Sequence, residues 1–132
     1  MKLMLDTDIC IYVIKQQPPS VLERFISHPV GDIGISSITV AELEYGVSKS
    51  RQATKNRVAL AQFLSPLEVA SFDRDASAAY GQLRATLERK GTPIGSMDLL
   101  IAAHALSLGV RIVTNNAREF RRVPGLRVES WG

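Results

Sequence analysis

Five short apolar runs alternate with segments of helical periodicity along the chain, and this alternation restricts the possible folds more than any other feature. The runs lie at residues 2–5, 32–36, 67–72, 110–114 and 126–130. Because they lack the three- and four-residue spacing of helices, each is predicted to be a strand. Strands that alternate with helices form a mainly parallel sheet covered on both faces. We therefore expect an α/β fold, a three-layer α/β/α sandwich with about five strands.

The segments between these runs repeat apolar residues at intervals of three and four, which predicts amphipathic helices. They cover residues 8–15, 19–27, 38–49, 53–64, 74–90 and 97–108. Pro18 and Pro19 are suited to open the second helix, and Asp73 is suited to cap the fifth. Gly91 and Gly109 stand where the fifth and sixth helices are expected to end.

Composition limits the class of protein. The chain has 132 residues, of which 45% are hydrophobic, so a single domain over residues 1–132 is expected. Its one cysteine, Cys10, excludes a disulfide within the chain and suits a reducing cytoplasm. No apolar stretch is long enough to span a bilayer. The net charge of +3 fits either a polyanionic partner or ordinary solubility.

Acidic residues follow the predicted strands or begin the predicted helices at four separate places. Asp6 comes directly after the first strand, and Glu42 lies early in the helix after the second. Asp98 lies in the first turn of a helix that Ser96 is expected to cap, and Glu119 follows the fourth strand by five residues. Because the carboxyl ends of parallel strands share one edge, we expect these four acids to gather there. Each acid alone could instead cap a helix or carry surface charge.

Gathered carboxylates raise one another's pKa unless cations compensate them, and this site lacks nearby cations in the sequence. No lysine or arginine stands close to Asp6, Glu42 or Asp98, and no histidine or cysteine pair has zinc-like spacing. Carboxylate ligands with open positions suit Mg²⁺, with Mn²⁺ as a possible substitute. The chemistry expected from such a site is metal-assisted hydrolysis of phosphodiester bonds.

Four blocks of the sequence resemble the signature blocks of PIN-domain ribonucleases, specifically the VapC toxins of bacterial toxin–antitoxin pairs. The blocks are "LDTDICIYVIK", "ISSITVAELEYGVSKS", "GTPIGSMDLLIAAHALSLG" and "IVTNNAREFRRVPGLRVESW". The resemblance implies a Mg²⁺-dependent endoribonuclease in which Asp6, Glu42 and Asp98 are catalytic, metal-binding acids. Polar residues of the same blocks would support these acids: Thr7, Ser36, Thr114 and Asn116.

The resemblance also implies partners. A VapB-type antitoxin would place its tail in a groove of the toxin, and operator DNA would be contacted only through that antitoxin. The RNA substrate would be a tRNA, best matched by initiator tRNA cut in the anticodon stem-loop. We also expect the protein to be a homodimer in the cytoplasm, without membrane contact.

Two positions depart from the family pattern. Many members carry an acid in the fourth block where this chain has Asn115 and Asn116, so the fourth catalytic charge is expected to pass to Glu119. That requires residues 116–122 to turn back over the site, and the alternative is a surface pair of Glu119 with Arg122. Asp8 stands where asparagine is frequent, and we expect it to cap the first helix.

Two other functions remain open from the sequence. The spacing of Asp6 and Asp8 also fits haloacid-dehalogenase-type phosphatases, in which Asp6 would be the nucleophile. The chain could instead be a non-catalytic module whose basic residues hold nucleic acid. His104 lies six positions after Asp98, on another face of the helix, and is expected to be a satisfied core histidine.

Overall fold

The computed structural model describes residues 1–132 and contains one five-stranded sheet in the order β3-β2-β1-β4-β5. Every pair of neighbouring strands is parallel. The strands are β1 (Leu3–Leu5), β2 (Ile33–Ser36), β3 (Glu68–Ala70), β4 (Arg111–Thr114) and β5 (Val128–Ser130). The expected α/β fold and its five strands are confirmed, and the sheet is wholly rather than mainly parallel.

Seven α-helices and one 3₁₀ turn, η1 (Val30–Asp32), connect the strands. The helices are α1 (Thr7–Lys15), α2 (Pro19–Ser27), α3 (Ser37–Ser48), α4 (Ala53–Leu64), α5 (Arg74–Lys90), α6 (Ser96–Leu108) and α7 (Ala117–Phe120). Asp73 caps α5, and Gly91 and Gly109 end α5 and α6 with positive φ, as expected. None of the helices combines the length and hydrophobicity that a bilayer span requires.

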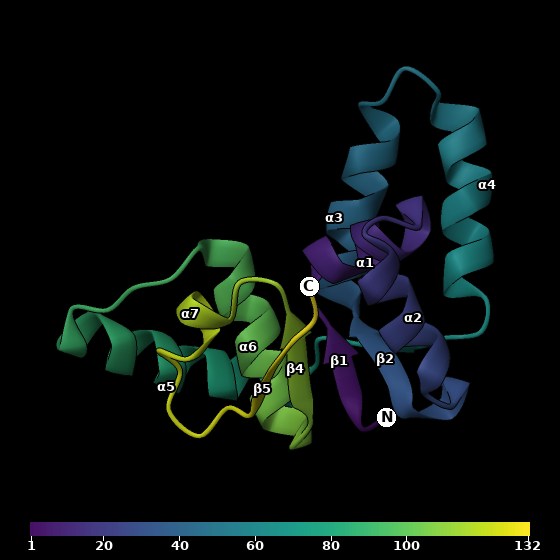
Figure 1. The fold of residues 1–132 in the computed structure, drawn as a ribbon. Coiled ribbons are helices and arrows are strands. Elements are labelled where there is room, and N and C mark those ends of the chain that lie inside the picture. The colour runs from purple at the N-terminus through teal and green to yellow at the C-terminus, as the bar shows by residue number, and fades with distance from the viewer.

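Alternation of side chains along the strands divides the core into two clusters. Leu3 and Leu5 of β1 pack on one face with residues of α1 to α4, whereas Met4 packs on the other face with residues of α5 to α7. Figure 1 shows α1 to α4 on one side of the strands and α5 to α7 on the other. The chain is therefore the expected three-layer sandwich.

The order of the strands places a change of direction between β1 and β4. From β1 the chain proceeds outward to β2 and β3 through α1 to α4, and it then returns through α5 and α6 to β4 on the other side of β1. In open parallel sheets, ligands bind outside the carboxyl ends of the strands at such a point. Asp6 and Thr114 occupy these two ends.

The last residues are anchored to the sheet. Trp131 is fully buried, and its backbone N–H donates to the Thr114 carbonyl at 3.0 Å. The indole stacks on the ring of His28, with 5.4 Å between centroids, and its N–H donates to Glu129. Glu129 also binds Arg111 at 3.1 Å, so the indole joins β5 to the first core cluster.

We expect Trp131→Ala to reduce the free energy of unfolding by about 3–5 kcal/mol, because it removes a fully buried aromatic side chain. Trp131→Phe keeps an apolar ring and should cost less. Chemical denaturation of the two variants and the parent measures these differences. Equal stability of Trp131→Ala and the parent would show that the C-terminal anchor contributes nothing.

Candidate active site

Asp6 lies at the centre of the sheet edge and has two structural partners. Its backbone N–H continues the strand ladder by donating to the Val113 carbonyl at 2.9 Å, and its side chain is 3% exposed. Its Oδ1 accepts from the Ile9 N–H at 3.0 Å, so Asp6 is the N-cap of α1. The expectation that Asp8 caps this helix was wrong: Asp8 lies exposed in its first turn, where an acid still favours the helix dipole.

Glu42 of α3 accepts a hydrogen bond from a hydroxyl group of α1. Thr7, the first residue of α1, donates from Oγ1 to Glu42 Oε1 at 2.5 Å, and it lies 3.3 Å from the Thr39 hydroxyl. Glu44, two residues further along α3, points elsewhere and pairs with Arg57 at 2.9 Å. Glu44 therefore lies outside the rim, whereas Thr7 lies beside Glu42.

Asp98 is half-buried in the first turn of α6. The expectation that Ser96 caps this helix was wrong, because Gly95 is the N-cap and Ser96 is the first helical residue. A Cβ at Gly95 would come within 3.4 Å of Glu119 Oε1 and 3.7 Å of Asp98 Oδ2. These are ordinary van der Waals distances, so Gly95 contributes its backbone N–H to Glu119 rather than space, a contact that sequence reasoning missed although Gly95 stands in the third block.

Glu119 reaches the site because the segment after β4 turns back as α7. Its Oε1 accepts from the Gly95 N–H at 2.6 Å, and its Oε2 accepts from Asn116 Nδ2 at 2.6 Å. Arg122 instead donates to the Pro93 carbonyl, so the alternative ion pair with Glu119 is absent. The structure therefore brings Glu119 beside the start of α6, with Asn116 positioning its carboxylate.

The pKa of Asp6 is raised to about 6, mainly by burial and to a smaller extent by the charges of Asp8 and Glu42. Hydrogen bonds from Thr114 and the Ile9 N–H act in the opposite direction. The Thr114 hydroxyl accepts from the Asn116 N–H at 2.8 Å, which leaves its hydrogen for Asp6. Thr114 therefore contacts the Asp6 carboxylate, and its supporting role stays a prediction.

Burial is also the largest cause that raises the pKa of Asp98 to about 7, followed by the charges of Glu119, Asp6, Glu42 and Asp8. The charges of the four other acids therefore all act on the Asp98 carboxyl group. No cationic side chain lowers either raised pKa. The rim is consequently a cluster of uncompensated carboxylates, which attracts a cation.

The four expected acids have no cationic partners. None of them forms an ion pair. Their side chains do not form a ready-made cage, because no three acidic, histidine or cysteine groups stand in metal-holding geometry. An open, oxygen-only donor set fits a hydrated Mg²⁺, which binds proteins through one or two carboxylates and keeps several waters.

Ser36 lies beneath the rim rather than among the acids. It is fully buried, and its Oγ accepts from the Ile38 N–H at 3.0 Å, which caps α3. The same Oγ lies 2.8 Å from His104 Nδ1 of α6. His104 is buried as expected, but only one of its ring nitrogens is satisfied, because Nε2 has no hydrogen-bond partner.

A groove of about 310 Å³ lies between α1, α3 and α4 and extends to Glu42. Figure 1 shows these three helices packed together beyond one side of the sheet. The lining is mainly apolar and includes Ile11, Ile14, Leu43, Val47, Ala59 and Leu60. The groove therefore combines an apolar floor with a carboxylate of the acidic rim.

Comparison with known proteins assigns this arrangement to a family. The PIN domain model matches residues 3–126. The chain is 49% identical over 131 residues to the tRNA(fMet)-specific endonuclease VapC of Shigella flexneri, covering 99% of this chain and 98% of that protein. The alternative of a phosphatase of another family, suggested by the Asp6 and Asp8 spacing, finds no support in these matches.

Two solved structures contain chains whose fold matches this chain over its whole length. The DNA-bound VapBC of Salmonella typhimurium contains a chain with a TM-score of 0.94 and 48% identity, and the match covers 100% of this chain and 99% of that one. VapBC2 of Rickettsia felis, bound to a promoter DNA fragment, gives a TM-score of 0.91 and 43% identity with full coverage of both chains. With its α/β/α sandwich and its acidic rim, the chain belongs to the VapC ribonucleases of the PIN-domain family.

Proposed function

We propose that this chain is a Mg²⁺-dependent endoribonuclease toxin that cuts initiator tRNA in the anticodon stem-loop and thereby inhibits translation. The observation that carries the proposal is the gathering of uncompensated acids at the switch point of the sheet. The substrate is supported by relatives named tRNA(fMet)-specific endonuclease, at 49% and 48% identity over 99% of this chain.

Asp6, Glu42 and Asp98 would hold Mg²⁺, and Glu119 would supply the fourth charge. When bound, Mg²⁺ supplies the positive charge that activates water and stabilises the leaving oxygen of the phosphodiester. Thr7 keeps one oxygen of Glu42 oriented, and Thr114 does the same for Asp6. These bonds orient Asp6 and Glu42, but the acidic side chains would still have to move closer together to hold the cation, because they do not form a ready-made cage.

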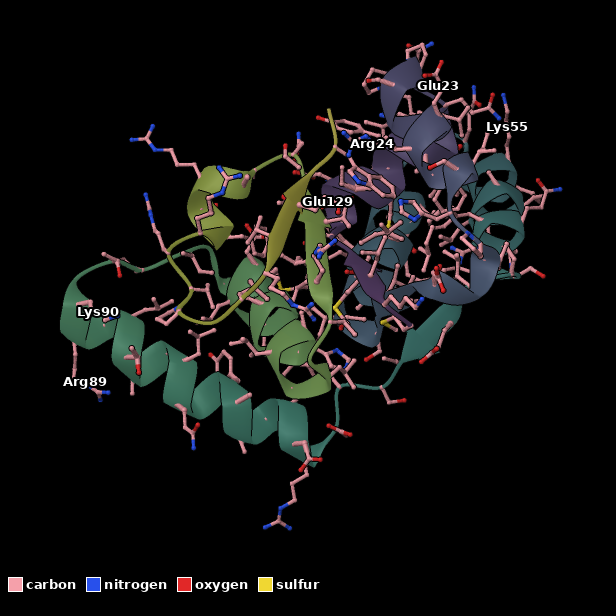
Figure 2. The ribbon with its side chains drawn as sticks, turned by 60° about the horizontal axis from the view of Figure 1, so that its bottom comes forward. Glu23, Arg24, Lys55, Arg89, Lys90 and Glu129 are labelled. Atoms are coloured by element: carbon pink, nitrogen blue, oxygen red, sulfur yellow. The ribbon has the colours of Figure 1, made fainter.

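The RNA backbone would be held by basic residues on the α5 to α7 side. Figure 2 shows Arg89 and Lys90 at the far end of α5, away from Glu23 and Lys55 of the opposite helices.

The basic residues of this side differ in their availability to RNA. Arg84 is less available, because it donates to Glu88 and to the Tyr80 hydroxyl. Arg118 is exposed on α7, next to Glu119. Phosphate contacts of this kind weaken with added salt.

Asp98→Asn should abolish Mg²⁺-dependent cleavage of initiator tRNA while the fold is kept, because the amide fits the same space without the charge. Glu44→Gln is the matched control, since Glu44 lies on α3 but pairs with Arg57 outside the rim. Cut sites mapped with and without Mg²⁺ provide the measurement. Full cleavage by Asp98→Asn would refute its assignment, and cleavage in the absence of divalent metal would refute the proposed chemistry.

Stability without divalent metal should fall as the pH rises from about 4 to about 7. The pKa of Asp98 is raised from 3.8 to about 7, so in this range the folded protein binds more protons than the unfolded chain. Mg²⁺ should restore stability most strongly above pH 7. Thermal unfolding across this pH range tests the effect, and Asp98→Asn should show a shallower decline than the parent.

Glu119→Gln should lose activity and require more Mg²⁺, because it replaces one oxygen that faces Asn116 with an amide nitrogen and removes the charge. Asn116→Ala keeps that charge and should lower the rate without a comparable change in metal requirement. Cleavage rates at limiting and saturating Mg²⁺ separate the two results. Parent-like behaviour of Glu119→Gln would reduce the acidic set to Asp6, Glu42 and Asp98.

A VapB-type antitoxin would occupy the groove between α1, α3 and α4. The apolar lining suits an amphipathic segment, and Glu42 at the end of the groove suits a basic side chain that would compete with the metal. Operator DNA would be reached only through that antitoxin, and the toxin would act as a homodimer. The partner is supported by the VapBC complexes that this chain resembles.

Ala59→Gln should weaken antitoxin binding by about tenfold or more, because it places a polar side chain in the groove. Ala61→Gln is the control, since Ala61 is exposed on the same helix outside the groove. Both changes keep a good helix former in α4. Titration of each variant with the antitoxin measures the difference, and equal affinities would exclude the groove as the binding site.

A further inference from the structure

A buried hydrogen bond joins the helix that carries Asp98 to the start of the helix that carries Glu42. His104 of α6 and Ser36 at the end of β2 are 1% and 0% exposed, and His104 Nδ1 lies 2.8 Å from Ser36 Oγ. No other side-chain hydrogen bond links α6 to the β2–α3 junction. The contact lies about 9 Å along α6 from Asp98, given the rise of a helix over six residues.

The direction of this bond follows from the other partner of Ser36. Ser36 Oγ already accepts from the Ile38 N–H at 3.0 Å, so its own hydrogen is free to donate to His104 Nδ1. Nδ1 must then be unprotonated, and the ring proton lies on Nε2, which has no hydrogen-bond partner. Burial lowers the pKa of His104, which keeps the ring neutral and able to accept.

The surroundings fix the ring in this orientation. The edge of Phe72 packs against the imidazole, with 5.3 Å between centroids and 77° between planes. The Phe72 N–H donates to Ser37 Oγ at 3.0 Å, so the segment after β3 is tied to the first residue of α3. The imidazole is therefore enclosed by elements that all meet the N-terminus of α3.

We propose that His104 is a positioning residue that sets the spacing of Glu42 and Asp98 by tying α6 to the cap of α3. Ser36 fixes the first turn of α3, from which Thr39 and then Glu42 project toward Thr7. His104 fixes Ser36 to α6, which carries Asp98. The inference rests on the proposed function, because the spacing matters only if these acids share a metal.

Packing alone does not explain the choice of residue. Leucine would fill a similar volume between α3 and α6, whereas the imidazole leaves Nε2 without a hydrogen-bond partner in the core. A buried polar atom of this kind costs free energy that an apolar side chain avoids. The histidine is accounted for by the bond that its other nitrogen makes to Ser36.

His104→Leu removes the acceptor, and His104→Asn keeps an oxygen that can accept from Ser36. We expect His104→Leu to raise the Mg²⁺ concentration needed for half-maximal thermal stabilisation and for half-maximal tRNA cleavage by about tenfold, with His104→Asn closer to the parent. Ser36→Ala should match His104→Leu. Ile101→Val, buried on the same helix, controls for general loss of packing and should keep the parent Mg²⁺ requirement.

A parent-like Mg²⁺ requirement in His104→Leu and Ser36→Ala would overturn the inference. The bond is also tested in the protein without metal, where His104→Leu should accelerate hydrogen exchange at the Ile38 amide and His104→Asn should not. Unchanged exchange in His104→Leu would overturn it as well. If the parent showed no response to Mg²⁺, the proposed function would fail, while the exchange measurement would still decide whether His104 holds the cap of α3.

Discussion

Burial of the Asp6 carboxylate at the middle of the sheet edge is the constraint on which the site depends. A buried charge needs compensation, and here it comes from the Ile9 N–H, the Thr114 hydroxyl and the N-terminal end of α1 rather than from a cation. The compensation is incomplete, because the pKa remains raised to about 6. The fold thus maintains a concentration of negative charge at the one place where its topology also leaves an opening.

The three layers of the sandwich each contribute to that opening. Asp6 comes from the sheet, Glu42 from the layer of α1 to α4, and Asp98 with Glu119 from the layer of α5 to α7. Distances among the acids therefore depend on how the two helical layers sit on the sheet. Few polar contacts cross between the layers near the rim, and the Asn115 side chain, which donates to the Tyr12 hydroxyl at 2.6 Å, is one of them.

The sequence pattern predicted every strand and all helices longer than one turn, because the central strands are short buried apolar runs and most helices bury one apolar face. The short helix α7 was expected only because Glu119 could not reach the other acids unless residues 116–122 turned back over the site. The identity of the N-cap residue was harder to predict. Asp6 caps α1 and Gly95 caps α6, instead of the expected Asp8 and Ser96. Two polar residues near a helix start can each serve as the cap, and only the path of the backbone decides between them.

The site residues themselves were named from the four sequence blocks, but their contacts could not be. The bond of Glu119 to the Gly95 N–H and the bond of His104 to Ser36 join residues 24 and 68 positions apart. Neither has a local signature, because such pairs are set by how whole helices pack. Their roles in catalysis stay predictions.

The central position of β1 between β2 and β4 also has a consequence for folding. Asp6 follows β1 and Thr114 ends β4, so strands that are adjacent in the sheet come from distant parts of the sequence. Pairing of distant segments carries a loop-closure entropy cost before the contacts form, which slows folding. The acidic rim therefore depends on the long-range pairing of β1 with β4, and no local segment of the chain can form it alone.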